Sequence, residues 1–499
     1  MKRLKSKITL LNTYSSLFLQ LAATINGFII PRLILSAFGS DVNGLVSSLT
    51  KFLSYIALVD GGISGVIIAT LYKPLATKDN ARTNAILATA KNFYSKIGII
   101  YIIYALALAV AYPMLFSTNF SHGYVFLLTI IISIRTIIQY LFSLTLKSLL
   151  TADKKIYVVS FVQGIINLLE IVLTIIAIKI YPDIHILKAI TGLIYLIQPL
   201  IFNAYVKKHY NIDQSSKIDN SLIKSRWNGF GVNLAGFIHG GTDTTVLTIF
   251  TNLATVSVYS VYALVTSGIR NIVMALVSSL NPVLGHAYAK KDFKNLHQKL
   301  DLYEYIIFML VFVIFGTAAL LITPFVEIYT NGINDANYSQ NLFGILIVIS
   351  EALYLLKWPH VNLAYSANKY KDVSKPAFIE AGLNIVISVV LVPFLGLIGV
   401  AIGTIVAMLY RLVFHVYYTS KIIPNRPQII FYRKLLIFLL ASALGIGLCL
   451  LVPAAKATIM SWALHAIIYS AILGAVLMLV SLLFFRPELR YLKNYLKKR

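Results

Sequence analysis

Residues 97–116 read IGIIYIIYALALAVAYPMLF, which is a run of twenty residues without a charged side chain. A helix of this length crosses the hydrocarbon core of a bilayer, which is about 30 Å thick, because each helical residue rises about 1.5 Å. Similar stretches recur along the whole chain and predict about fourteen transmembrane helices. They are expected at residues 8–35, 45–72, 97–116, 124–146, 156–178, 189–206, 228–250, 256–280, 303–322, 341–363, 376–395, 398–418, 435–452 and 460–485. The predicted fold class is an all-α polytopic membrane protein.

The composition excludes an ordinary soluble protein. Of the 499 residues 58% are hydrophobic and only 12% are charged, whereas a soluble domain has about 25% charged residues. The chain has one cysteine, Cys449, so neither a disulfide framework nor a cysteine-based metal site is expected.

The formal net charge of +25 raises the alternative of a nucleic-acid-binding protein. The distribution of the charge argues against it. About 34 of the 43 Lys and Arg residues fall in segments assigned to the cytoplasm, and about four fall in external loops. This asymmetry follows the positive-inside rule. It predicts that both termini are cytoplasmic and that the partner is the bilayer rather than nucleic acid.

The spans group into two similar halves. An offset of 213 residues aligns residues 75–79 with 288–292 and residues 33–38 with 246–251. Both halves begin on the cytoplasmic side, which predicts parallel repeats, a plan used by secondary transporters. We therefore expect a six-helix lobe at 1–206, a cytoplasmic linker at 207–227 and a second six-helix lobe at 228–420. Two extra helices and a basic tail would follow at 421–499.

Charged groups within or beside the apolar spans are the candidate functional residues, because charge inside a membrane is costly and usually functional. The substrate-binding candidates are the cations Arg32, Arg135, Arg270 and Lys357. The candidates for ion coupling or charge balance are the carboxylates Asp60, Glu170 and Asp243. Because a guanidinium binds phosphate through paired hydrogen bonds, a cleft that contains arginine would suit an anionic substrate.

Arg135 and Arg270 lie closest to the middle of their spans. A competing interpretation is that they form internal salt bridges, with Glu170 or Asp243 as partner. The two roles are compatible, because a carboxylate can neutralise an arginine until substrate replaces it.

A structural role is the competing interpretation for the other charged groups in the spans. Glu351 and Lys357 are six residues apart on one helix and should not pair directly. Arg411 and His415 lie near the inner end of their span and are expected to extend to the cytoplasmic interface. Glu380 lies near the cytoplasmic start of its span.

The sequence lacks the common catalytic signatures. It contains no phosphate-binding loop, no His-Glu-x-x-His pattern and no Gly-x-Ser-x-Gly pattern. The cytoplasmic loops are also too short for a catalytic domain. We expect neither an enzyme nor catalytic residues, and the sequence predicts no cofactor and no metal.

Two motifs near the N-terminus suggest a family. The first is Pro31-Arg32-Leu33-Ile34-Leu35-Ser36-Ala37-Phe38-Gly39 followed by Asn43-Gly44-Leu45, and the second is Gly61-Gly62-Ile63-Ser64-Gly65 followed by Leu71-Tyr72-Lys73-Pro74-Leu75-Ala76. They resemble the start of Wzx-type polysaccharide flippases of the multidrug/oligosaccharidyl-lipid/polysaccharide exporter superfamily. The resemblance implies two lobes around a central cavity. It also implies movement of an undecaprenyl-diphosphate-linked oligosaccharide across the bacterial cytoplasmic membrane, for surface polysaccharide synthesis, by ion- or potential-driven alternating access.

In members of that superfamily that flip lipid II, arginines on the first, second and eighth spans matter. Arg32 and Arg270 match two of those helices, while the second span offers Asp60 instead. The resemblance also implies a polysaccharide polymerase and glycosyltransferases as candidate partners. Alternative functions are a multidrug/cation antiporter, a lipid II flippase and a scaffold that recruits glycosyltransferases.

Overall fold

The computed structural model describes residues 2–60, 62–116, 119–213, 218–219, 241–453 and 457–497. Across these residues the chain is helical and contains no strand. Twelve helices in the described part are long and apolar enough to cross a membrane. The chain is therefore a multi-pass, all-α membrane protein, as the hydropathy pattern predicts.

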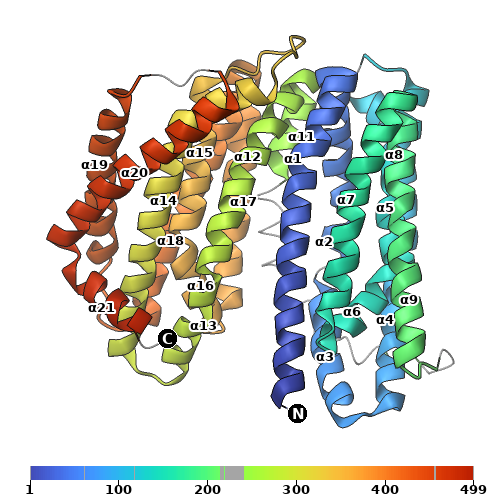
Figure 1. The fold of residues 1–499 in the computed structure, drawn as a ribbon, viewed down its shortest axis with the longest axis horizontal. Coiled ribbons are helices and arrows are strands. Elements are labelled where there is room, and N and C mark those ends of the chain that lie inside the picture. Colours follow the sequence, from blue (N-terminus) through green and yellow to red (C-terminus); the bar gives the residue numbers. More distant parts are fainter. Residues whose placement is uncertain are drawn as a thin grey trace. The chain divides into compact units, whose positions relative to one another are not determined.

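The chain divides into two compact units, Met1–Phe237 with Asn252–Ser257, and Ile238–Thr251 with Val258–Arg499. The helices of the first unit are α1 (Lys2–Ser54), α2 (Ala57–Asp60), α3 (Ile63–Thr77), α4 (Asn80–Leu115), α5 (His122–Ile138), the π-helical turn η1 (Gln139–Ser143), α6 (Leu144–Ala152), α7 (Ile156–Ile180), α8 (Ile184–Leu193), η2 (Ile194–Leu196) and α9 (Ile197–His209). Within this unit α1 packs along α7, and α5 packs against both α4 and α8 (Figure 1).

The remaining helices belong to the second unit, apart from the first residues of α12. They are α11 (Thr242–Phe250), α12 (Leu253–Val277), η4 (Ser278–Leu280), α13 (Asn281–Ala289), α14 (Phe293–Tyr329), α15 (Asn341–Leu356), α16 (Trp358–Ser366), α17 (Tyr370–Leu395), α18 (Leu397–Ile422), α19 (Ile429–Leu450), α20 (Ile459–Phe484) and α21 (Arg486–Lys497). The last three follow the predicted boundary at residue 421.

Helix α1 contains a break that divides two of the predicted spans. Its 53 residues would extend about 80 Å if straight, more than twice the thickness of the hydrocarbon core. Gly39 interrupts it with φ 82° and ψ 179°, a conformation that glycine adopts without steric cost. Most of the predicted seventh span, and of the predicted linker, lies outside the described residues. The count of fourteen spans and the lobe boundaries remain predictions.

The predicted repeat has matching local geometry in both units. Lys78, after α3, and Lys291, after α13, have left-handed φ values of 57° and 53°. The next residues, Asp79 and Asp292, each cap the following long helix by accepting a hydrogen bond from the backbone N–H three residues later. The two junctions lie 213 residues apart, which is the offset of the sequence repeat.

A second pair of junctions repeats in the same way. Lys154, between α6 and α7, has φ 62°, and Asn368, between α16 and α17, has φ 57°. Each is followed two residues later by the start of a long helix. Two matched junctions support the duplication of one helical plan.

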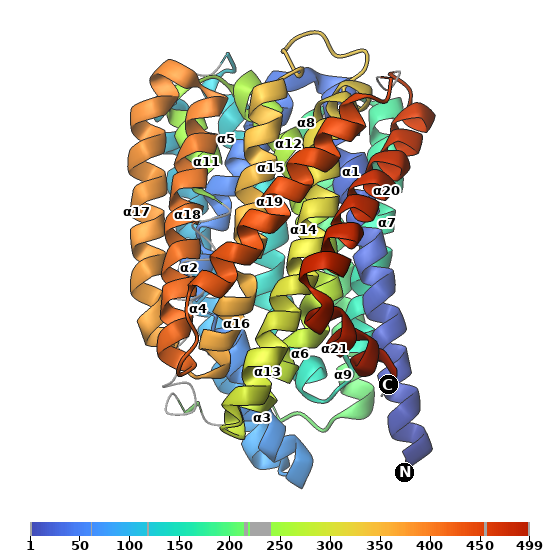
Figure 2. The same ribbon diagram turned by 90° about the vertical axis from the view of Figure 1, so that its left-hand side faces the viewer.

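Helices α17 and α18 pack unusually closely and lie side by side in Figure 2. A Cβ added at Gly399 would lie 2.7 Å from the backbone carbonyl carbon of Leu391, and one at Gly403 would collide with the Ser388 hydroxyl. This Gly-x-x-x-Gly pair therefore serves close helix approach. Two other Gly-x-x-x-Gly pairs occur in the sequence, Gly61/Gly65 and Gly236/Gly240. Of these residues Gly61, Gly236 and Gly240 lie outside the described residues.

Candidate functional site

The centre of the candidate site is an ion pair between α12 and α15. Arg270 Nη1 donates hydrogen bonds to both carboxylate oxygens of Glu351, at 2.8 and 2.9 Å. The two side chains are only 23% and 13% exposed. Arg270 thus forms an internal salt bridge, as the competing interpretation holds, but its partner is Glu351 and not Glu170 or Asp243.

Tyr354, one turn after Glu351, connects this pair to a second group of charges. The Arg270 guanidinium carbon lies 5.4 Å from the centre of the Tyr354 ring, and the Lys357 Nζ lies 4.5 Å from it. Both are within the range of a cation–π interaction. Glu351 and Lys357 do not pair directly, as their spacing predicts.

Glu380, on α17, lies beside two further cations, Arg411 and Lys357. Arg411 Nη1 lies 2.6 Å from Glu380 Oε2, whereas Lys357 Nζ lies 3.9 Å from Oε1. Lys357 also donates to the Met408 sulfur, a weak acceptor, at 3.2 Å. Lys357 is therefore a buried cation that has no carboxylate of the described residues within hydrogen-bonding distance.

These five groups, which we call the cationic cluster, comprise Arg270, Glu351, Lys357, Glu380 and Arg411. Three cations share two carboxylates, so with every group ionised the cluster has an excess of one positive charge. Such a cluster can accept an anion without leaving its negative charge uncompensated.

The predicted role of Arg411 and His415 is wrong. Both are buried, at 5% and 1% exposed, and neither extends to the interface. Arg411 is neutralised by Glu380 on the neighbouring helix, so it does not need to reach water.

Asp243, on α11, lies among uncharged oxygen-bearing side chains. Its Oδ2 accepts hydrogen bonds from Tyr259 and Thr404, both at 3.0 Å. Asn384 donates to the Thr404 hydroxyl at 2.9 Å. One turn after Asn384, the buried Ser388 hydroxyl has no hydrogen-bond partner among the described residues. Carboxylate, hydroxyl and amide oxygens suit a hard cation such as Na⁺ or a proton.

In the first unit, Arg135 and Glu170 share one aromatic neighbour. The Arg135 guanidinium lies 4.0 Å from the centre of the Tyr195 ring, and the Tyr195 hydroxyl donates to Glu170 at 3.4 Å. Asn26 also donates to Glu170, at 3.2 Å. Arg135 therefore stacks on Tyr195 and does not form the salt bridge with Glu170 that the competing interpretation allowed. Lys188 interacts electrostatically with both charged groups.

The other two sequence candidates are on the first helices. Arg32 is half-buried on α1, and Asp60 is half-buried at the end of α2. One Asp60 oxygen, Oδ1, is buried without a hydrogen-bond partner among the described residues. That these helices meet Asp243 and Arg270 at a central cleft remains a prediction.

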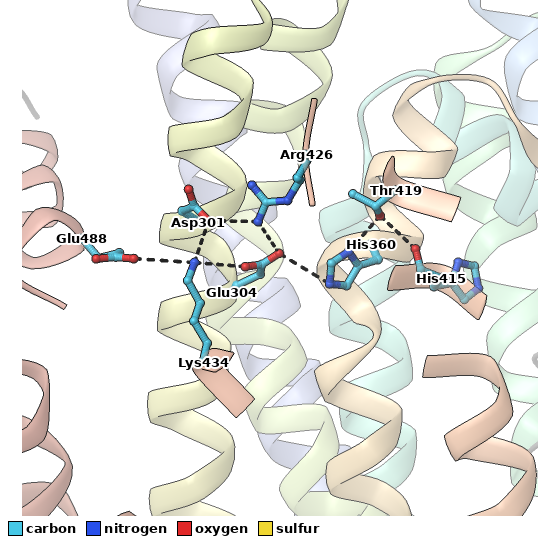
Figure 3. Close-up of polar contacts among 8 residues, drawn as sticks. All are labelled: Asp301, Glu304, His360, His415, Thr419, Arg426, Lys434 and Glu488. Atoms are coloured by element: carbon cyan, nitrogen blue, oxygen red, sulfur yellow. Dashed lines mark hydrogen bonds and ion pairs between the residues drawn. The ribbon is translucent and has the colours of Figure 1, made fainter. Parts of the chain in front are cut away.

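A second buried charge cluster connects α14 to the C-terminal helices (Figure 3). We call Asp301, Glu304, Arg426 and Lys434 the anchor cluster. Arg426 Nη2 donates to Asp301 at 2.9 Å and to Glu304 at 2.7 Å, and Lys434 Nζ donates to the same residues at 2.6 and 3.1 Å. Burial opposes the charge on Arg426, but Glu304 and Asp301 outweigh it and raise the pKa of this guanidinium.

Two histidines extend the anchor cluster toward α18. His360 Nε2 lies 3.6 Å from Glu304, and its Nδ1 lies 2.8 Å from the Thr419 hydroxyl (Figure 3). Thr419 donates its proton to the His415 carbonyl oxygen at 2.9 Å. The His360 Nδ1 is consequently the donor toward Thr419.

The sequence interpretation missed the anchor cluster and assigned Glu351 and Glu380 no role. A useful signal was available for the first: Asp301 and Glu304 are one helical turn apart at the start of a long apolar run. Two acids on one helix face beside the membrane need cations from another helix.

No protein-family model matches the chain, and no curated protein matches its sequence. Solved structures do resemble it. A structure of the lipid II flippase MurJ in an inward closed conformation has 16% identity and a TM-score of 0.73, with 96% of this chain and 99% of that one covered.

Multidrug transporters of the MATE family are similar over a smaller share of the chain. An inward-facing MATE transporter of the MOP superfamily has 14% identity and a TM-score of 0.62, with 82% of this chain and 96% of that one covered. The MATE multidrug transporter DinF-BH, in a ligand complex, has 15% identity and a TM-score of 0.59, with 83% and 97% covered.

The fold of the chain is that of a multi-pass membrane protein. More specifically, it is the fold that the MurJ and MATE structures share.

Proposed function

We propose that this protein flips a polyprenyl-diphosphate-linked oligosaccharide across the bacterial cytoplasmic membrane for the synthesis of a surface polysaccharide. The excess positive charge of the cationic cluster supports the proposal most directly. A diphosphate is a strong anion, and arginine and lysine are its usual protein ligands. Organic cations would instead need an excess of carboxylates.

The cluster provides a mechanism for transient binding. Glu351 and Glu380 neutralise the cations while no substrate is present. When the diphosphate arrives, Lys357 can engage it without losing a carboxylate hydrogen bond. The sugar head group cannot cross hydrocarbon unaided, because burying unpaired polar groups costs several kcal/mol each, about 2–7.

We propose Asp243 as the ion-coupling residue. It is buried and bonded only to neutral donors among the described residues, so Na⁺ binding or protonation would change the local charge directly. The test is to measure flipping under an imposed Na⁺ gradient and, separately, under an imposed pH gradient. Asp243→Asn should abolish the response to the effective gradient, while retained coupling in this variant would contradict the assignment.

Two alternatives have support from the comparisons. A lipid II flippase has the same substrate chemistry, and MurJ covers a larger share of this chain than the MATE structures do. A multidrug antiporter shares the fold. The charge excess favours a lipid diphosphate over an organic cation but does not choose between the two glycolipids.

A binding experiment can test the proposal. The purified full chain in nanodiscs is titrated with undecaprenyl-diphosphate oligosaccharide, lipid II and a lipophilic organic cation, tetraphenylphosphonium. We expect the oligosaccharide lipid to bind most tightly and Lys357→Met to weaken it by about tenfold or more, on the scale of one charged hydrogen bond. Preference for lipid II would support that alternative, and binding of the cation alone would overturn the proposal.

Candidate protein partners follow from the same function. A flipped oligosaccharide lipid must be made on the cytoplasmic face and polymerised outside, so we propose glycosyltransferases and a polysaccharide polymerase as partners. Their presence in a purified complex is the corresponding test.

A further inference from the structure

A large cavity lies wholly within the first unit, apart from the groups described above. Its volume is about 800 Å³, within the range of about 300–1,000 Å³ that is usual for small-molecule sites. The walls come from the start of α4, the π-helical turn η1, and α6 and α9 with the residues that follow α9. Figure 1 shows the start of α4 and the end of α9 at the same end of this unit as the α3–α4 junction.

The polar part of this cavity is suited to an anion. Lys91 and Lys207 line it together with the amides of Asn84 and Asn203, and Asp213 is the single carboxylate among its described lining residues. Both lysines are exposed, so they can change rotamer to reach a ligand.

The apolar part of the cavity opens outward. Leu200 is 68% exposed, Phe142 is 55% exposed and Leu196 is 39% exposed. In a membrane protein, exposed side chains of this kind contact lipid chains. Phe142 belongs to the π-helical turn, a local deformation that occurs frequently at functional sites.

The wall next to the lysines is held in place by side-chain hydrogen bonds. The Tyr210 hydroxyl donates to Asp153 at 2.6 Å, and Asn84 donates to the Asn211 carbonyl oxygen at 3.4 Å. A cavity held in this way needs little reorganisation when a ligand binds.

We propose that this cavity binds an anionic phospholipid of the cytoplasmic leaflet, with its phosphate at Lys91 and Lys207 and an acyl chain along Phe142 and Leu200. Basic pockets between membrane helices on the cytoplasmic side bind such head groups. The α3–α4 junction at the same end carries Lys73, Lys78 and Arg82, and the positive-inside rule places that end in the cytoplasm. The site does not depend on which substrate is flipped.

The test is native mass spectrometry of the delipidated full chain titrated with phosphatidylglycerol. Phosphatidylcholine and inorganic phosphate are the comparison probes. Lys91→Gln/Lys207→Gln removes the proposed phosphate ligands. Lys96→Gln/Lys208→Gln is the charge-matched control, because these residues lie on the same two helices and do not line the cavity. Leu200→Trp fills the apolar part.

We expect phosphatidylglycerol to bind about 10-fold to 30-fold more weakly to the first double variant, since each lysine near anionic lipid contributes about fivefold. The control should bind like the unaltered protein, and Leu200→Trp should also weaken binding. Equal affinity in both double variants would overturn the proposal. Equal binding of phosphatidylcholine and phosphatidylglycerol would also overturn it. A site for free anions would be indicated instead if inorganic phosphate displaced phosphatidylglycerol equally well from the unaltered protein and from Leu200→Trp. Equal melting temperatures establish that all variants are folded.

Discussion

Arg270 contacts both carboxylate oxygens of Glu351 through a single nitrogen, Nη1. The usual two-pronged pairing of arginine with a carboxylate uses two nitrogens. Here Nε and Nη2 make no hydrogen bond within the described part of the chain, so they remain available to a second acceptor. Arg270 can therefore hold a substrate phosphate while Glu351 still compensates part of its charge.

Arg270→Lys should separate these two functions. Lysine can still pair with Glu351 but lacks the second set of planar donors. We expect flipping to fall about 10-fold to 100-fold, the scale of a hydrogen bond to a charged group, with little change in melting temperature. Arg82→Lys, at an exposed position, is the matched control. Full activity of the Arg270→Lys protein would exclude a two-pronged phosphate contact.

A double-mutant cycle should show that Arg270 and Glu351 are energetically coupled. Arg270→Met and Glu351→Met each leave one largely buried charge without its partner, whereas the double variant leaves none. We expect each single variant to have a lower melting temperature than the double variant. If the decrease in melting temperature of the double variant equalled the sum of the two single decreases, the pair would not be coupled.

Lys434→Met should destabilise the second unit. Lys434 is 6% exposed and bonds to Glu304, which is 0% exposed. Removing one partner of such a buried pair costs about 3–5 kcal/mol. The expected result is a clear drop in melting temperature and faster proteolysis near α19. Lys421→Met removes an exposed lysine nearby in the sequence and should have no such effect.

Gly403→Ala should loosen the contact between α17 and α18. The added methyl would collide with the Ser388 hydroxyl. Neither helix can move without disturbing the hydrogen bonds from Asn384 on α17 to Thr404 on α18 and from Thr404 to Asp243. Gly447→Ala is the control, because its added Cβ would meet nothing within 4 Å. In a helix interior that change is favourable by up to about 1 kcal/mol. Equal thermal stability of the two variants would contradict the close-packing role of Gly403.

The helical class and most spans were predictable because they depend on local hydropathy. The repeat was also visible, since Asp79 and Asp292 cap equivalent helices at the predicted offset. The choice of Arg270 as a candidate rested on a similarly local fact, its position near the middle of an apolar segment.

Pairing partners could not be predicted in this way. Glu351 lies 81 residues after Arg270, and only the packing of α15 against α12 makes it the partner. Arg411 was expected to reach the interface because it lies near the inner end of its span. The compensating Glu380 comes from α17, so the error arose from considering one helix at a time.

Flipping in proteoliposomes tests the central claim most directly. The protein is reconstituted with fluorescent undecaprenyl-diphosphate oligosaccharide, and a membrane-impermeant quencher reports the leaflet of the label under an imposed ion gradient. Arg270→Ala is compared with Arg82→Ala. We predict gradient-dependent flipping by the unaltered protein and the Arg82→Ala control, and its loss in Arg270→Ala. Unchanged flipping by a folded Arg270→Ala protein would contradict the assignment of the cationic cluster as the substrate site.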